Sequence, residues 1–484
     1  MPSSPTVRGA RLRPLAAALA TALLLGACAS PGADTRPLDA LTPAQLALTT
    51  QPSPDIQPQW WRSLGDAQLD TLVAQALQGS PNLAVARART QRAQALAQAL
   101  HAANGPQATL GVDASRQRYT ANGLVPPPVA GHWWNSASVQ AGLAWSPDFF
   151  GQHAAEQASA LGQAQAAQAD AAAAETLLAL QVARGYVALA RTLAQQDLAR
   201  RTLAQRQEIR DITHQRLGAG LDSRVQDTQA AAALPDMRAQ IEALQEQAVL
   251  TRRQLAVLAG QPPDALRALA PRLAALILQT PPQALGADLL GRRPDVVAAR
   301  WRVEAATQDV TVARTQFYPN VNLSAFIGLN ALGMDQLLQA SSRQIGVSPA
   351  LRLPLFDGGR LRAQLGGKRA DLDVAIAQYN ATVLDAVKEA GDAIASGQSL
   401  ERQHAEQGQA LDGAEQAYAL ALQRYRAGLD SYLVVLNAES QVLAQRRLAA
   451  DLRARQFDTY LALMKALGGG WNDTALQPHA LAAE

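Results

Sequence analysis

Features that would identify a compact globular enzyme are scarce in this chain of 484 residues. It has one cysteine and four methionines, and aromatic residues make up only 4% of it. After the amino-terminal segment, no apolar run reaches about 20 residues, the length that a membrane-spanning helix needs. What is abundant is Ala, Gln, Leu and Arg, a mixture that favours long helices packed through small residues. A membrane crossing by this chain would therefore have to use strands.

An excess of basic charge is also lacking once the amino terminus is set aside. The formal net charge is +3, from 43 basic and 40 acidic residues. Three of the basic residues, Arg8, Arg11 and Arg13, lie in a segment that is expected to be removed, which leaves 40 against 40 (43 − 3 = 40). No basic cluster is interleaved with aromatic residues. We therefore expect no nucleic-acid partner.

The amino terminus has the order of a secretory signal, with a basic stretch followed by an apolar stretch from Leu15 to Leu25. Leu25-Gly26-Ala27-Cys28 resembles a bacterial lipobox, which predicts a signal peptide over 1–27 and an N-acyl diacylglycerol on Cys28. Ala29, rather than Asp, follows, and in bacterial lipoproteins this implies sorting to the outer membrane. The alternative is a signal peptide that ends near a cysteine by chance. Residues 28–58 are expected to form an extended, lipidated linker.

One structural plan is written twice in the chain. The segment from Gln215 to Ser223 returns from Gln423 to Ser431, and both copies contain Ala-Gly-Leu-Asp-Ser. Prolines that punctuate the neighbouring segments recur in the same order about two hundred residues later, as an internal duplication predicts. We therefore divide the chain into a first repeat over 59–262, a connection with an equatorial segment over 263–292, a second repeat over 293–468 and a carboxy-terminal tail over 469–484.

Each repeat contains two segments in which polar and apolar residues alternate over about ten positions, the length of a tilted strand that crosses a bilayer. They lie near 107–118, 133–147, 319–329 and 344–355. A soluble sandwich would need more strands to close a core. Four strands cannot close a barrel, and open edges are not viable in hydrocarbon, so several chains must share one barrel. The sequence thus predicts an oligomer.

Long helices flank the strands. No proline occurs from His153 to Arg216, and a helix of that length would extend roughly 95 Å. Apolar residues in these stretches repeat in heptads, which indicates helices packed side by side. Gly220 and Gly428 suit left-handed positions in turns near 218–223 and 426–431. Ser223 with Gln226 has the spacing of a capping box, and Pro235 is expected to interrupt the hydrogen-bond ladder and bend its helix.

A catalytic or metal-binding constellation is lacking as well. The histidines have no second ligand group nearby in sequence, so we expect no metal site, no cofactor and no enzyme activity. Asp357-Gly358-Gly359-Arg360 has no P-loop lysine pattern, and its glycines instead suit a sharp exit from strand to helix, as does Gly151. Trp60 and Trp61 are expected to pack locally. The histidines are His101, His132, His153, His214, His404 and His479.

The order of these elements closely resembles the TolC-like outer-membrane factors of tripartite efflux pumps, in the NodT-type lipoprotein branch. The resemblance is carried by Trp60-Trp61, the segment Leu289 to Val296, Phe317-Tyr318-Pro319-Asn320 and the two Ala-Gly-Leu-Asp-Ser turns. It implies an α+β membrane protein that forms a homotrimer in the bacterial outer membrane. A twelve-stranded transmembrane β-barrel, with four strands per chain, would continue into a long periplasmic α-helical coiled-coil barrel. A periplasmic adaptor and an inner-membrane transporter are the implied partners of an exit duct that catalyses nothing.

The resemblance also assigns the tip of the helical barrel. The adaptor would meet the two turns, and the periplasmic gate would lie just after them, at Leu433, Asn437, Gln226 and Asp227. Leu433 and Asn437 are four residues apart and share a helical face. Many relatives carry a carboxylate where Asn437 stands, so we expect a tip held closed by apolar and amide contacts. Asn437 as an ordinary exposed coiled-coil position is the alternative. The turn residues are Gly220, Leu221, Asp222, Ser223, Gly428, Leu429, Asp430 and Ser431.

Two other functions stay open at this point. One is a TolC-like conduit for a type I protein secretion system, which adjacent genes for an adaptor and a proton-driven transporter would exclude. The other is a structural periplasmic coiled-coil lipoprotein, which would form no ion-conducting trimer. The lipobox and the Arg292-Arg293-Pro294-Asp295-Val296 segment favour the efflux duct for drugs or other small toxic compounds.

Overall fold

The computed structural model describes residues 36–46, 56–279 and 289–471. Its backbone contacts divide the chain into two compact units. The first unit holds residues 1–39, 91–164 and 301–378, and the second holds 40–90, 165–300 and 379–484. Each unit therefore takes segments from both sequence repeats. Cys28 and the predicted signal peptide lie outside the described residues.

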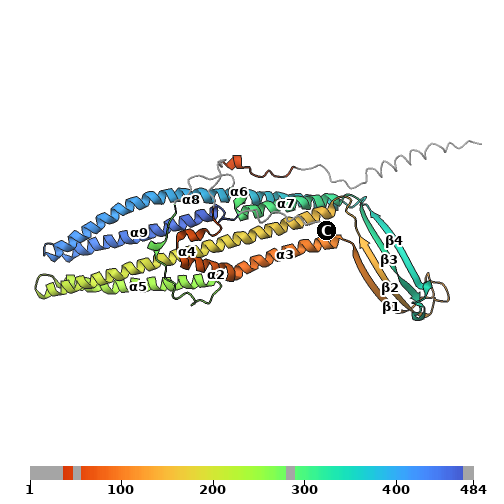
Figure 1. Ribbon diagram of the computed structural model, residues 1–484, viewed down its shortest axis with the longest axis horizontal. Helices are drawn as coiled ribbons and strands as arrows, with labels where there is room; N and C mark the ends of the chain where they lie inside the picture. Colours follow the sequence, from red (N-terminus) through yellow and green to blue (C-terminus); the bar gives the residue numbers. More distant parts are fainter. Residues whose placement is uncertain (1–35, 47–55, 280–288, 472–484) are drawn as a thin grey trace, which may run out of the picture. The chain divides into compact units, whose positions relative to one another are not determined.

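The helices occur in matched pairs, one from each repeat. The longest are α4 (Gln152–Gly218) and α8 (Arg360–Arg426), both of 67 residues. Each is followed by a helix of 35 residues, α5 (Arg224–Leu258) or α9 (Tyr432–Ala466). Figure 1 shows the two hairpins α4–α5 and α8–α9, each closed by its short turn. This equality of length confirms the duplication and the long helices predicted from the sequence.

Shorter helices precede the strands. α2 (Ala67–Gly79) leads to α3 (Pro81–Asn104). In the second repeat, α7 (Pro294–Thr315) is the counterpart of α3 and follows the short α6 (Leu289–Arg292). Three-residue to five-residue helices complete the described set: η1 (Pro43–Leu46), η2 (Trp60–Leu64), η3 (Leu273–Ala275), η4 (Met334–Gln336) and η5 (Ala340–Ser342). Both α3 and α7 begin with proline, whose missing N–H would have no partner in the first turn.

The strands β1 (Gln107–Arg118), β2 (Trp133–Trp145), β3 (Asn320–Leu332) and β4 (Arg343–Arg352) form one antiparallel sheet in sequence order. Residues directly opposite each other share a face. Val112 lies opposite Val139, Val139 opposite Leu329, and Ile327 opposite Ile345. Over the middle of the sheet one face is therefore apolar, while the other is polar or small apart from Phe326. The alternation predicted from the sequence is thus confirmed.

The strand ends differ from the prediction by two or three residues. β2 ends at Trp145 rather than 147, and β4 ends at Arg352 rather than 355. Pro147 and Pro354 follow closely, and proline cannot donate to a sheet ladder. β3 instead continues to Leu332, past the predicted 329, up to Gly333 with its φ of 103°. Proline placement and a turn glycine therefore set these boundaries.

The sharp exits from the sheet into the long helices are made as predicted. Gly151, Gly358 and Gly359 have φ of 77°, 66° and 89°. An aspartate accompanies each exit, because Asp148 Oδ2 accepts from Ala154 N–H (2.9 Å) and Asp357 Oδ2 accepts from Leu361 N–H (2.7 Å). These carboxylates satisfy amides that have no partner inside the helix.

The main hydrophobic core lies in the second unit. Trp60 and Trp61 are buried in it with their rings edge to face, which confirms local packing. Val182, Tyr186 and Leu189 of α4, which follow one another at heptad spacing, are fully buried in the same core. The first unit has its own cluster around Phe317, Leu361 and Leu365. The helices are therefore held together by their apolar seams.

The Arg-Arg-Pro-Asp-Val segment has a structural role in the second unit. Arg293 is buried and donates to Asp295 (2.6 and 3.0 Å) and Glu389 (2.9 Å). Lys465 donates to the same Glu389 (2.6 Å), so the start of α7, the middle of α8 and the end of α9 are joined. The motif thus fixes helices rather than a ligand.

Two further predictions concern the amino-terminal linker and the proline inside α5. Part of the predicted extended linker is tied down, because Leu41 N–H donates to Asn380 Oδ1 (2.8 Å). Pro235 lies inside α5, which runs on from Arg224 to Leu258, and the bend expected at this proline stays a prediction. No helix among the described residues has the length and apolar character needed to span a membrane.

Candidate functional site: the helical hairpin turns

Both repeated turns are closed by the same backbone bonds. In the first, Leu221 N–H donates to the Arg216 carbonyl (2.8 Å) and Gly220 N–H to the Leu217 carbonyl (2.9 Å). Leu429 and Gly428 repeat this pattern with the carbonyls of Arg424 and Tyr425 (both 2.9 Å). Such paired bonds define a Schellman motif, and φ of 77° at Gly220 and 76° at Gly428 meets its left-handed requirement. The predicted glycine roles are confirmed.

The first turn is bound to the other hairpin through Asp222. Its carboxylate accepts from Arg216 Nε (3.0 Å) and from Tyr425 Oη (2.8 Å), and only 4% of the Asp222 side chain is exposed. The Arg216 guanidinium lies 4.9 Å above the Tyr425 ring, and Thr213 Oγ1 lies 2.9 Å from Tyr425 Oη. Burial raises the pKa of Tyr425, so its hydroxyl stays a donor. Asp222 therefore joins α4 and α8.

The second turn makes fewer contacts. Arg424 Nε donates to Asp430 Oδ2, which repeats the Arg216–Asp222 pair of the first turn. The Asp430 side chain is 25% exposed, against 4% for Asp222. Arg426 donates to Glu208 (2.8 Å), but both side chains are more than half exposed. Exposed pairs of this kind contribute little to stability.

The four predicted gate residues fall into two groups. Leu433 and Asn437 are both exposed on α9, one helical turn apart. Gln226 instead completes the predicted capping box, since its Oε1 accepts from Ser223 N–H (2.6 Å) and its own N–H donates to Ser223 Oγ (3.4 Å). Asp227 lies 3.2 Å from His214 Nδ1 within the first hairpin. The first group is therefore free to face a pore, and the second is engaged in its own hairpin.

The turn residues also differ in orientation. Leu221 and Leu429 occupy equivalent positions and are 66% and 68% exposed. Asp222 points its carboxylate into the packing between the hairpins. Among the predicted contact residues, the two leucines therefore offer the apolar surface of the turns.

Sequence reasoning missed a buried ion pair close to the turns. Arg206 Nε of α4 donates to Glu439 Oε2 of α9 (2.9 Å), with 9% and 5% of their side chains exposed. Arg206 Nη1 also donates to the Ala233 carbonyl of α5 (3.3 Å). Three helices from both hairpins are joined by this one guanidinium.

The periodicity contained a signal for this pair. Residues Thr202, Arg206, Ile209 and Thr213 step by four, three and four, and all are buried. Glu439 similarly follows Tyr432 by seven residues on the buried side of α9. A charged residue at a seam position predicts a buried partner. The partner's identity required the fold.

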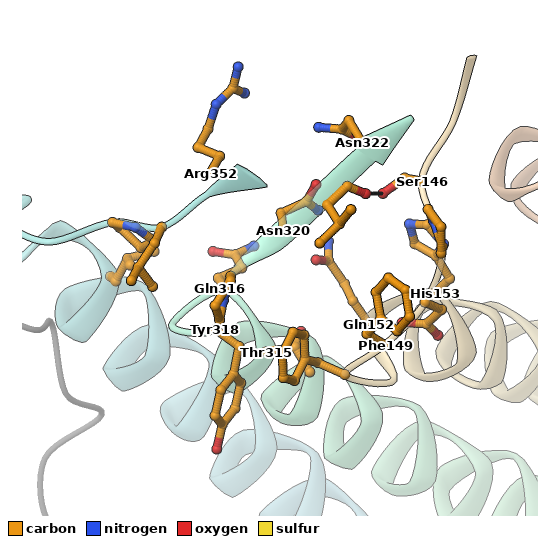
Figure 2. Close-up of a pocket in the computed structure, with 18 of the residues that line it drawn as sticks. Ser146, Phe149, Gln152, His153, Thr315, Gln316, Tyr318, Asn320, Asn322 and Arg352 are labelled. Atoms are coloured by element: carbon orange, nitrogen blue, oxygen red, sulfur yellow. Dashed lines mark hydrogen bonds between the residues drawn. The ribbon is translucent and has the colours of Figure 1, made fainter. Parts of the chain in front are cut away.

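A second candidate lies in the first unit, where the strands join the helices. A cavity of about 690 Å³ is lined by the ends of β2, β3 and β4 and by neighbouring helix residues. Figure 2 shows polar side chains around it, with Ser146 Oγ bonded to the Val321 carbonyl (3.2 Å) and Arg352 extending away from the other labelled residues. Asn320 and Arg352 lie opposite each other on the polar face of the sheet. The cavity therefore includes residues from the polar face of the sheet.

Within the described ranges, no group of three or more His, Cys, Asp or Glu side chains is placed to hold a metal ion. The arrangement at the turns joins helices by hydrogen bonds and ion pairs, and the arrangement at the sheet separates an apolar face from a polar one.

Comparison with known proteins gives a consistent result. The family model described as outer membrane efflux protein matches residues 72–261 and 285–469, one range in each repeat. The multidrug resistance outer membrane protein MdtP of Shigella flexneri is 34% identical over 474 residues, covering 94% of this chain and 96% of MdtP. The fusaric acid resistance protein FusA of Burkholderia cepacia is 38% identical over 73% of this chain and 69% of its own.

Among solved structures, the chain is similar to the outer membrane protein VceC of Vibrio cholerae. The TM-score is 0.81 at 35% identity, over 85% of this chain and 99% of VceC.

Proposed function

The chain belongs to the outer membrane efflux protein family, and we propose that it is the exit duct of a tripartite efflux system. Channels of this family are trimers with a helical barrel, and this chain has the fold of one protomer. It is an outer-membrane protein, and its family transports rather than catalyses. The observation that carries the proposal is that one face of the sheet is apolar and suits lipid, while the other is polar and suits water.

The apolar face of the sheet is exposed in the single chain. Leu110, Val112, Ile345, Val347 and Leu351 are each at least 67% exposed. An exposed apolar area of this extent marks a surface that is covered in the functional state. Lipid covers it when strands of this length cross a bilayer, while the polar face lines a water-filled interior. The sheet thus separates lipid from an aqueous path.

The outer edges of β1 and β4 support a trimer. Within the chain, neither edge has a strand partner among the described residues. Unpaired backbone amides and carbonyls cost several kcal/mol each in hydrocarbon, on the order expected for lost hydrogen bonds. We therefore assign the edges to strands of neighbouring copies, three chains closing one barrel.

We assign the exposed leucines Leu221 and Leu429 to contact with a periplasmic adaptor, which would link the duct to an inner-membrane transporter. Leu433 and Asn437 are the residues assigned to the gate, because both are exposed on one face of α9. If Asn437 lines the pore, Asn437→Asp adds three carboxylates and raises the cation selectivity of the reconstituted channel. Unchanged conductance and selectivity would remove Asn437 from the gate.

The names of the relatives suggest small toxic compounds as cargo. Deletion of the gene is expected to sensitise cells to such compounds, and purified protein is expected to conduct ions in a planar bilayer. A protein that forms no trimer and no conducting pore would refute the duct. Lipidation at Cys28 is tested separately, since Cys28→Ser should abolish palmitate incorporation.

A further inference from the structure

Glu439 is unusual among the acidic residues of this protein. Within 36–46, 56–279 and 289–471 it is the one acidic residue that is buried as a whole residue, at 4% exposure, although the Asp222 side chain is covered to a similar degree. It lies seven residues after Tyr432, the first residue of α9, and therefore close to the second turn. Burial of an ionised carboxylate is costly unless it is fully paired. Its surroundings determine how well that cost is offset.

The pairing of Glu439 is incomplete. Oε2 accepts from Arg206 Nε at 2.9 Å, whereas Oε1 is buried and has no hydrogen-bond partner among the described residues. Arg206 divides its donors between Glu439 and the Ala233 carbonyl. The desolvation cost of Oε1 is therefore not offset by a hydrogen bond.

Groups from four helices surround the pair. Arg206 faces Glu439 from α4, the Ala233 carbonyl of α5 holds Arg206, Tyr418 of α8 lies near, and Tyr432 lies on α9 itself. Burial raises the pKa of Tyr432 to about 12, so the tyrosine stays neutral. The next ion pair along the helices, Arg446 with Glu415, is considerably more exposed. Glu439 is thus the buried acid of this cluster.

Burial raises the pKa of Glu439 above its ordinary value of 4.5, and Arg206 opposes this only in part. If the hairpins separate, Glu439 enters water and its pKa returns towards 4.5. The packed arrangement therefore binds the proton more tightly than the separated one. By linkage, acid favours packing, and a rise of pH through the raised pKa favours separation.

We propose that Glu439 is the proton-binding residue of a pH-sensitive coupling between the two hairpins, which keeps them packed while its carboxyl is protonated and loosens them when the carboxyl ionises. The coupling rests on the proposed function, since the hairpins form the periplasmic end of the duct. Arg206 is its positioning residue, because it holds the carboxylate at the contact of three helices.

The coupling is tested by distance measurements between the two turns. Ala219 and Ala427 occupy equivalent exposed positions, and Ala219→Cys with Ala427→Cys provides sites for spin labels in the full-length reconstituted protein. Labelled chains are diluted into unlabelled ones so that each assembly carries one labelled pair. From pH 5 to pH 8 we expect a growing population at longer distance, changing by at most about tenfold per pH unit for one proton.

Glu439→Gln mimics the protonated carboxyl and should give the packed distance at every pH. The double variant Arg206→Met with Glu439→Leu replaces the pair by apolar side chains and should also lose the pH response. Glu208→Gln is the matched control, since Glu208 forms an exposed contact between α4 and α8. His214→Gln controls for the imidazole that lies beside Asp227. Both controls should respond like the unaltered protein.

A pH response that survives in Glu439→Gln, or is absent from the unaltered protein, overturns the coupling. Conductance in a planar bilayer is recorded on the same samples. Absence of conductance at every pH contradicts the duct, whereas conductance with no pH-dependent distance contradicts only the coupling.

Discussion

The two Ala-Gly-Leu-Asp-Ser turns have the same backbone and different surroundings. Each has a Schellman motif and an arginine that donates to the aspartate of its own turn. Asp222 is nearly inaccessible and also accepts from Tyr425 of the other hairpin. Asp430 is six times more exposed, at 25% against 4%. Both copies of the motif thus form a turn, but only the first copy, through Asp222, also connects the two hairpins.

The two turns show that different residues close a turn and connect the hairpins. Neither copy needs its partner hairpin to form the turn, because the bonds that close it lie within a few residues. The residues that connect the hairpins, Tyr425 and the Arg206–Glu439 pair, occur in one repeat only. At the equivalent positions the other repeat has Leu217, Ala414 and Ala231. The residues that the two repeats share thus form the turns, and residues that differ between the repeats connect the hairpins.

The largest expected effect is on the buried pair. Arg206→Ala leaves Glu439 buried without a counter-charge and should reduce the free energy of local opening by about 3–5 kcal/mol. Hydrogen exchange of peptides from the first turn of α9 measures this loss. Arg426→Ala breaks the exposed contact with Glu208 and should cost no more than about 1 kcal/mol. Equal losses in the two variants would contradict the distinction between buried and exposed connections.

A smaller difference is expected between the turn aspartates. Asp222→Ala removes the acceptor of the partly buried Arg216 and of the fully buried Tyr425, and should cost roughly 1–3 kcal/mol of local stability. Asp430→Ala should cost less than about 1 kcal/mol, because its pair is exposed. Exchange of amides in both hairpins should increase in the first variant, and only around the second turn in the other. If Asp430→Ala loosened both hairpins, the second turn would also be a connector.

The helix caps give a third comparison. Ser223 forms a capping box with Gln226, whereas Ser431 makes no side-chain cap bond, and Val434 at the equivalent position has no polar side chain that could complete a box. Ser223→Ala should destabilise the start of α5 by about 1 kcal/mol. Ser431→Ala should change the start of α9 by less than about 0.5 kcal/mol. Protection of the first-turn amides of each helix is the measurement, and a larger loss at α9 would argue against the observed cap.

The glycines should show no difference at all. Gly220→Ala and Gly428→Ala each place a Cβ in the left-handed region and should each cost about 1–2 kcal/mol. Thermal unfolding of each reconstituted variant, followed by circular dichroism, compares the two. Clearly unequal shifts would mean that the turns are less alike than their backbones indicate.

Much of this architecture could be predicted because it depends on local patterns. Helix lengths follow from heptad spacing without proline, and strand faces follow from alternation. The Ser223–Gln226 box and the left-handed glycines follow from spacing and backbone sterics. The strand ends near Pro147 and Pro354 were predicted too long, because alternation in the sequence continues past Trp145 and Arg352, the last residues that pair with a neighbouring strand.

The connections between hairpins could not be predicted in the same way. Arg206 and Glu439 are 233 residues apart in sequence, and periodicity shows only that each faces a seam. Asp222 and Gln226 were assigned outward roles, yet one joins α4 to α8 and the other caps its own helix. Which neighbour a side chain meets depends on how the helices are rotated against each other.

By itself the sequence determined the duplicated plan, the turns, the four strands with one apolar face, and the family. These features follow from interactions within a few residues or from the periodicity of apolar residues along one helix or strand. Only the tertiary structure decided that Asp222 is a buried connector and that Glu439 is a half-paired buried acid beside Arg206. Those outcomes depend on helix faces brought together across long stretches of chain, where one rotation of a helix exchanges a buried charge for an exposed one.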